Sequence, residues 1–180
     1  MKGFWRVKGM FSTRKLVLMG LFVAMTAVLS PLDIYLSDDF RLLSFRFLPG
    51  ALGSILFGPW AGLLMGFPGD FLAFLINPHG GYFPGYALSD MVSNFLFALC
   101  LYRRPVTWPR VLTAQALVGV IVSLGLGSVW LHMMWGSTAG ELFTGFRLLK
   151  TLAAYPLNAA LVYGLGRAVM AAAPRFLRED

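Results

Sequence analysis

Six long apolar runs constrain the fold of this chain more than any other feature of its sequence. They cover residues 16–36, 45–57, 60–76, 85–102, 111–135 and 142–170, with turn residues or charges between them. A helix that crosses a bilayer needs roughly 20 mainly apolar residues. The chain is 58% hydrophobic and only 13% charged, which is far more apolar than a soluble domain. The pattern predicts an all-α integral membrane protein, a compact bundle of six transmembrane helices.

The second and third runs are too short to cross a bilayer as straight, independent helices. They meet at Gly58-Pro59, and this pair of residues favours a turn. We therefore expect the chain to break there and both short helices to be supported by their neighbours.

The basic residues sort by loop, and this distribution predicts the orientation of the bundle. Eleven of the fifteen lie before the first run, between the fourth and fifth, or after the last: Lys2, Arg6, Lys8, Arg14, Lys15, Arg103, Arg104, Arg110, Arg167, Arg175 and Arg178. By the positive-inside rule, both termini are cytoplasmic in a multi-pass protein of the cell membrane. Residues 1–15 then form a basic cytoplasmic segment, 16–170 the bundle and 171–180 a cytoplasmic tail.

Two alternative interpretations of the charges and the N-terminus are weaker. A net charge of +7 could indicate nucleic-acid binding, but the sorting by loop argues against a nucleic-acid partner. The N-terminus could be a cleaved signal peptide, but its removal would leave five spans and break the alternation of charge.

The sequence contains none of the common motifs of an enzyme or a metal site. It lacks a G-x-x-x-x-G-K-[ST] phosphate loop, an H-E-x-x-H motif and a G-x-S-x-G motif. Its two histidines, His79 and His132, are far apart, and its single cysteine, Cys100, can form no internal disulfide. We expect a binding, transport or assembly protein that is not an enzyme and holds no metal or cofactor.

Four ionisable residues inside the apolar runs are candidates for a binding site, namely Asp70, Asp90, Arg147 and Lys150. Each costs about 2.5 to 3.5 kcal/mol to insert into a bilayer, so such residues are often functional. In the orientation above, Asp70 lies mid-way along the third span, and the other three lie near the outer leaflet. They could line a pocket open to the outside, or Asp70 could pair with Arg147 in a structural ion pair.

Aromatic and polar residues gather in the same outer regions. Residues 77–86 include Asn77, Tyr82 and Phe83, and Trp130 lies near the end of the fifth run. Aromatic rings offer flat faces for stacking, while arginine or lysine attracts carboxylates and aspartate accepts paired N–H donors. A planar, nitrogen-rich, anionic ligand would use all of these groups, although aromatic residues at span ends are also ordinary interfacial anchors.

Small residues recur at a spacing of four along the apolar runs, and such positions allow close approach of another helix. Most copies are expected to pack within the bundle. The Gly20/Ala24 copy in the first run is expected to face outward, because its helix is terminal and otherwise built of bulky residues.

An ordered series of motifs resembles the folate-type substrate-binding (S) components of energy-coupling factor vitamin transporters. The motifs are R-L-L-S-F-R-F-L-P at 41–49, L-F-G-P at 56–59, G-D at 69–70, Y-F-P-G-Y-A-L-S at 82–89, W-L at 130–131 and R-L-L-K at 147–150 with Pro156. The resemblance extends over about residues 14–168. It implies a subunit that binds a folate-like vitamin on the outer face and docks through its first helix, at Gly20 and Ala24, onto a transmembrane coupling subunit. Two cytoplasmic ATPases would drive that coupling subunit, and they rather than this chain would use ATP.

The resemblance also assigns provisional roles within the site. Its ligand contacts would be Arg41, Asp70, Asn77, Tyr82, Phe83, Trp130, Arg147 and Lys150. Asp70 would accept hydrogen bonds from the pterin ring, the aromatic residues would sandwich the rings, and Arg41, Arg147 or Lys150 would hold the glutamate carboxylates. The acidic loop 33–39 would form a lid.

Two other functions stay open at this point. Asp90 and Asn94 stand where members of the family usually carry small residues, so the ligand could be another vitamin or a precursor. A membrane scaffold, whose glycine faces serve lateral association and transport nothing, would also fit the apolar runs.

Overall fold

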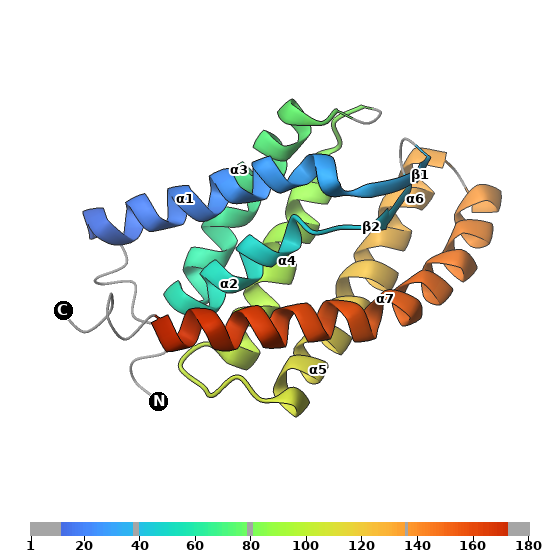
Figure 1. Ribbon diagram of the computed structural model, residues 1–180. Coiled ribbons are helices and arrows are strands. Elements are labelled where there is room, and N and C mark those ends of the chain that lie inside the picture. Colours follow the sequence, from blue (N-terminus) through green and yellow to red (C-terminus); the bar gives the residue numbers. More distant parts are fainter. Residues whose placement is uncertain (1–11, 38–39, 79–80, 136, 173–180) are drawn as a thin grey trace.

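The computed structural model describes residues 12–37, 40–78, 81–135 and 137–172, and for 34–37, 40–43, 131, 135 and 137–153 it describes the backbone alone. The helices are α1 (Thr13–Leu29), α2 (Phe47–Phe57), α3 (Pro59–Ile76), α4 (Pro84–Leu101), a continuous segment of α5 (Trp108–Leu117), the π-helix η2 (Val118–Leu126) and α6 (Gly127–Trp135), and α7 (Ser137–Ala172). The described part of the chain therefore contains six successive helical segments (Figure 1). This confirms the predicted all-α bundle.

The first helix is shorter than the sequence predicts, because it ends at Leu29 and not near residue 36. A 3₁₀ turn, η1 (Ser30–Leu32), follows it, and Pro31 in this turn lacks the N–H that would continue the helical hydrogen bonds. The apolar residues after the turn form β1 (Ile34–Ser37), which pairs antiparallel with β2 (Phe40–Leu43). This small hairpin between α1 and α2 was not predicted.

The break between the two short helices lies at Gly58, as the sequence predicts. Gly58 has a φ of +98°, a conformation that only glycine adopts readily, and Pro59 begins α3. A side chain at Gly58 would also meet the ring of Tyr102, which lies 3.1 Å from the position of a Cβ. The chain therefore passes from α2 to α3 through Gly58 alone, without a longer loop.

Among the described residues, three helical segments are long and apolar enough to cross a membrane, namely Thr13–Leu32, Pro59–Ile76 and Trp108–Met134. The prediction that the third run is too short to cross is therefore wrong, because α3 begins at Pro59 and has 18 residues. The apolar helix α2 has 11 residues, and at 1.5 Å per residue it extends only about 17 Å, against about 30 Å for a hydrocarbon core. Residues 48–55 of α2 are all buried. Neighbouring helices therefore surround α2, as the shortness of its apolar run predicts.

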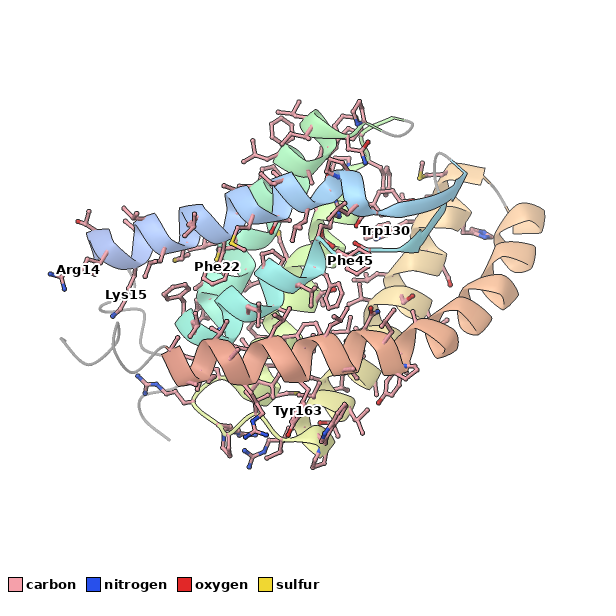
Figure 2. The ribbon with its side chains drawn as sticks, in the orientation of Figure 1. Arg14, Lys15, Phe22, Phe45, Trp130 and Tyr163 are labelled. Carbon is pink, nitrogen blue, oxygen red and sulfur yellow. The ribbon has the colours of Figure 1, made fainter. Side chains whose placement is uncertain are left out.

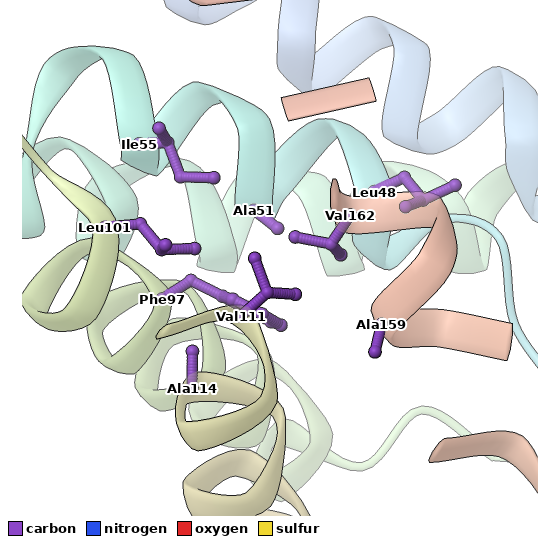
Figure 3. Close-up of a cluster of buried hydrophobic side chains, with 9 residues drawn as sticks. All are labelled: Leu48, Ala51, Ile55, Phe97, Leu101, Val111, Ala114, Ala159 and Val162. Atoms are coloured by element: carbon purple, nitrogen blue, oxygen red, sulfur yellow. The ribbon is translucent and has the colours of Figure 1, made fainter. Parts of the chain in front are cut away.

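Two clusters of buried apolar side chains hold the helices together. The larger one joins α2, α4, α5 and α7 and is made of Leu48, Ala51, Ile55, Phe97, Leu101, Val111, Ala114, Ala159 and Val162 (Figure 3). The smaller one joins α1 to α3 through Met19, Ala61 and Met65. Because α2 contributes to the larger cluster along most of its length, it forms the centre of the bundle.

Glycines allow α3 and α4 to approach closely. A Cβ on Gly66 would lie 2.6 Å from Met91 Cα, and one on Gly62 would lie 3.1 Å from the backbone oxygen of Asn94. Gly20 differs, because nothing lies within 4 Å of a Cβ placed there. Ala24, one turn further along α1, is also exposed. Gly62 and Gly66 of α3 thus serve internal packing, while Gly20 and Ala24 of α1 face outward.

The bundle has two distinct ends. The start of α1, the turn at Gly58, the connection between α4 and α5, and the end of α7 lie at one end (Figure 1). The hairpin, the connection between α3 and α4, and the junction of α6 with α7 lie at the other (Figure 1). We call the second the hairpin end. This arrangement gathers residues from distant parts of the sequence around the hairpin.

Candidate functional site

Arg46 organises a buried group of charges at the hairpin end. It directly precedes α2 and is only 5% exposed. Its Nη2 lies 2.7 Å from Asp70 Oδ1 of α3 and 3.3 Å from Asp90 Oδ2 of α4, and its Nε lies 3.6 Å from Asp33 Oδ2 after η1. One guanidinium, with its planar set of five N–H donors, thus faces three carboxylates from three different parts of the chain.

The three carboxylates differ in exposure. Asp70 and Asp33 are buried, and Asp33 Oδ1 also accepts a hydrogen bond from the Phe45 N–H at 2.9 Å. Asp33 therefore ties the two ends of the hairpin together from a buried position. Asp38 and Asp39, the other acidic residues of the loop 33–39, lie outside the described residues. The Asp90 side chain is 32% exposed, so it forms the accessible edge of the group.

Aromatic rings form a wall next to these charges. Tyr82 lies between Phe71 and Phe74 of α3, with ring centroids 5.6 and 5.1 Å away. Its hydroxyl is buried and has no hydrogen-bond partner among the described residues. Burial, with the carboxylates of Asp70 and Asp90, raises the pKa of Tyr82. The phenol therefore stays protonated, and a bound acceptor could satisfy it.

Trp130 of α6 belongs to a second group of rings, which we include in the wall because Phe83 follows Tyr82 directly in the chain. Its Nε1–H donates to Ser89 Oγ at 2.9 Å, and the Ser89 hydroxyl donates in turn to the Gly85 backbone oxygen. Phe83 packs edge-to-face against Trp130, with a centroid separation of 5.6 Å. A Cβ on Gly85 would clash with the ring of Phe83 and lie 2.8 Å from Trp130, so glycine is needed for this packing.

The charged group and the aromatic wall lie at the end of the bundle away from the basic start of α1. Arg14 and Lys15 mark that start, whereas Phe45 and Trp130 lie toward the hairpin (Figure 2). Fixed carboxylates can accept N–H donors of a ligand, and the rings offer stacking faces. Together they can bind a flat, nitrogen-rich molecule.

Comparisons with known proteins identify the family. The sequence profile of the family described as "ECF transporter, substrate-specific component" matches residues 14–173. The chain belongs to this family. It is therefore an S component, a transporter subunit and not an enzyme, as its motifs indicate.

Characterised relatives of this S component are folate transporters. It is 33% identical over 127 residues to "Folate transporter FolT" of Clostridium novyi (strain NT), covering 71% of this chain and 73% of the relative. It is 32% identical over 160 residues to the protein of that name from Leuconostoc mesenteroides subsp. mesenteroides, covering 85% and 84%. A solved structure, "Crystal structure of FolT bound with folic acid", is similar with a TM-score of 0.78 and 30% identity over 87% of this chain and 95% of that one. The scaffold alternative is thereby set aside.

Five of the eight predicted ligand contacts have described side chains, and all five belong to elements that meet at the hairpin end. Asp70, Tyr82, Phe83 and Trp130 contribute to the charged group or the wall as described. Asn77 makes a structural contact there, in which its Nδ2 donates to the Ser30 backbone oxygen at 3.0 Å. It holds the end of α3 against η1.

The other three predicted contacts have only their backbones described. Arg41 lies in β2, and Arg147 and Lys150 lie in α7. His79 lies outside the described residues. Asp70 pairs with Arg46. The alternative ion pair between Asp70 and Arg147 stays a prediction, because only the backbone of Arg147 is described.

The sequence analysis did not identify three residues of this S component's candidate site. Arg46 and Asp33 were assigned to an outer loop, and Ser89 was treated only as part of a motif. A charged residue that directly precedes a wholly apolar helix, as Arg46 does, was the available signal.

Proposed function

We propose that this S component binds a folate-like vitamin at the hairpin end and delivers it to a coupling module driven by ATP hydrolysis. The carrying observation is the Asp70 carboxylate, which Arg46 fixes beside Tyr82 and the aromatic wall. The similarity to a protein solved with folic acid supports the same ligand class. A pterin ring has paired N–H donors and a flat face, and it matches this combination of carboxylate and rings.

The proposed roles follow from this placement. Asp70 accepts the N–H donors of the pterin, and Tyr82, Phe83 and Trp130 enclose the rings. Arg41, Arg147 and Lys150 bind the glutamate carboxylates, because β2 and the start of α7 belong to the same end of the bundle (Figure 1). The hairpin covers the site as a lid.

The proposed orientation places the hairpin end outside the cell. The start of α1, the connection between α4 and α5, and the end of α7 share the opposite end (Figure 1), and these segments carry Arg14, Lys15, Arg103, Arg104, Arg110 and Arg167. The positive-inside rule then makes both termini cytoplasmic. Segments 1–15 and 171–180 flank the membrane domain 16–170 on that side.

The proposed function is tested by comparing folate with pteroate, which lacks the glutamate. The purified wild-type protein is expected to bind folate more tightly than pteroate, as measured by the quenching of tryptophan fluorescence. In the double variant Arg147→Glu/Lys150→Glu, we expect this preference to be lost while pteroate affinity changes little. If the wild-type protein binds neither molecule, the proposal is wrong; if the preference for folate survives the charge reversal, the carboxylate assignment is wrong.

A second candidate is an S component for a different vitamin or precursor. Asp90 supports it, because this carboxylate lies 3.3 Å from Arg46 and is partly exposed. An additional acceptor at the site could favour a more cationic ring. Mass spectrometry of the small molecule that co-purifies with the protein decides between the two: a pterin supports folate, and any other vitamin supports the second candidate.

The proposed docking face is the exposed side of α1 around Gly20 and Ala24. Large apolar residues surround it, including Val17, Leu21 and Val28, and the open space at Gly20 would let a helix of a partner approach closely.

Gly20→Trp is expected to abolish folate uptake by cells that contain the coupling module, while folate affinity of the purified protein stays within twofold of wild type. The bulky ring would prevent close approach without touching the core. Val120→Trp, at an exposed position of η2 away from α1, is the matched control and should retain uptake. Normal uptake by Gly20→Trp would reject this face.

A further inference from the structure

A stacked aromatic pair joins two helices at the end of the bundle opposite the hairpin. Trp108 begins α5, and Tyr163 lies in the second half of α7. Their rings are parallel to within 19° and their centroids are 4.4 Å apart. Trp108 is nevertheless 44% exposed. An exposed tryptophan at a helix end is typical of the boundary between lipid and water.

Arg167 contacts Tyr163 of this pair, and Arg110 follows Trp108 by two residues. Arg167 donates from Nη1 to the Tyr163 hydroxyl at 3.0 Å, and its guanidinium lies 5.6 Å from the centre of the Tyr163 ring. Arg110 donates from Nη1 to the Pro105 backbone oxygen, which fixes it beside the connection between α4 and α5. We call Trp108, Tyr163, Arg110 and Arg167 the aromatic–arginine platform. Tyr163 lies between α7 and α5, near nitrogen-tipped side chains (Figure 2).

No acidic residue of the same segments neutralises the platform. Residues 91–140 and 142–178 contain no aspartate or glutamate. Arg110 and Arg167 form no ion pair with any residue in the described part of the chain. Arg103 and Arg104 add two further positive charges in the adjacent connection. The platform thus has an excess of positive charge, which favours the binding of an anionic partner.

The geometry favours a phosphate group as that partner. A guanidinium has five N–H donors, and Arg110 and Arg167 each use one group in a contact that fixes the side chain. The remaining donors can bind phosphate oxygens in the paired manner that arginine favours. Because the contacts to Tyr163 and Pro105 already hold these side chains, binding costs less side-chain entropy.

We propose that the aromatic–arginine platform is a binding site for the phosphate of an anionic phospholipid. The exposed ring of Trp108 supports a lipid over a soluble phosphate, since it would lie among the headgroups and upper acyl chains while the arginines hold the phosphate. This site is at the opposite end of the bundle from the proposed vitamin site and does not depend on the identity of the vitamin.

The experiment is native mass spectrometry of the purified full-length protein with equal amounts of phosphatidylglycerol and phosphatidylcholine. Wild type is expected to retain phosphatidylglycerol at least tenfold more than phosphatidylcholine, since each arginine near the surface contributes about fivefold. Arg110→Gln/Arg167→Gln should lose this preference. Arg14→Gln/Lys15→Gln removes the same charge from the same end but away from the platform, and it should keep the preference. Arg167→Lys, which keeps the charge but not the planar donors, should fall between.

Three results would overturn the proposal. Equal loss in the two double variants would mean that the preference is only a general effect of charge. Displacement of the lipid by millimolar glycerol 1-phosphate would assign the platform to a soluble phosphate. Unchanged lipid retention with lost binding to the coupling subunit would assign it to an acidic protein surface.

Discussion

Replacing Arg46 with leucine is expected to abolish folate binding and to lower the stability of the folded protein by about 3–5 kcal/mol. Leucine removes the guanidinium that faces three carboxylates, two of them buried. Removing one member of a buried ion pair leaves the other uncompensated, and this is far more costly than removing the whole pair. The unfolding midpoint, followed by tryptophan fluorescence, and folate titration measure the two effects.

A double variant distinguishes this electrostatic cause from lost packing. Arg46→Leu/Asp70→Asn removes the charge of the nearest carboxylate as well, so it is expected to recover part of the stability but none of the folate binding. Arg46→Lys keeps one charge but cannot reach all three carboxylates with a planar fork, and it should be intermediate. If Arg46→Leu is as stable as wild type, the charged group does not hold the hairpin end together.

Asp70→Asn is expected to weaken folate binding about tenfold to a hundredfold, because hydrogen bonds to a charged group are worth roughly 1.5–3 kcal/mol. The amide keeps the size of the side chain, and its oxygen can still accept the hydrogen bond from Arg46 Nη2. The asparagine amide has an NH2 group in place of the second carboxylate oxygen, so it cannot accept a further N–H donor from the pterin there. Calorimetric titration of the purified variant with folate measures the loss.

Asp33→Asn is the matched control for this prediction. It also removes one carboxylate charge next to Arg46, but Asp33 uses Oδ1 to hold Phe45 N–H, and an amide oxygen can do the same. We expect its folate affinity to fall less than threefold. Equal losses in the two variants would show that Asp70 acts through charge alone and makes no direct contact with the pterin.

The helical architecture could be predicted because each helix leaves a local signal in the sequence. Apolar runs located the six helices, and Gly58-Pro59 located the break between α2 and α3, since a positive φ and a missing N–H act within one or two residues. The hairpin was missed for the opposite reason. Its residues 34–36 are as apolar as a helix end, and besides Pro31 the contacts of Ser30 with Ala73 and of Asp33 with Phe45 keep them out of α1.

The candidate site could be predicted only in part. Asp70, Tyr82, Phe83 and Trp130 could be named as candidates because charges within an apolar run and aromatic rings near its ends are visible in the sequence. The partner of Asp70 was not visible, because Arg46 is 24 residues away along the chain and the choice between Arg46 and Arg147 depends on how the helices pack. The contact of Asn77 with the Ser30 backbone oxygen was not visible either, because an amide near a turn looks the same whether it binds a ligand or the backbone; its predicted contact with the ligand stays a prediction.

The close contact between α3 and α4 determines which substitutions α3 can tolerate during evolution. The inner side of α3 leaves no room for a methyl group at Gly62 or Gly66, so nearly every substitution there would push two helices apart. Its outer side carries Leu64, Phe67 and Leu72, all exposed, and any apolar residue serves equally well at those positions. Homologous proteins should therefore exchange the large residues of this helix freely and keep the smallest ones.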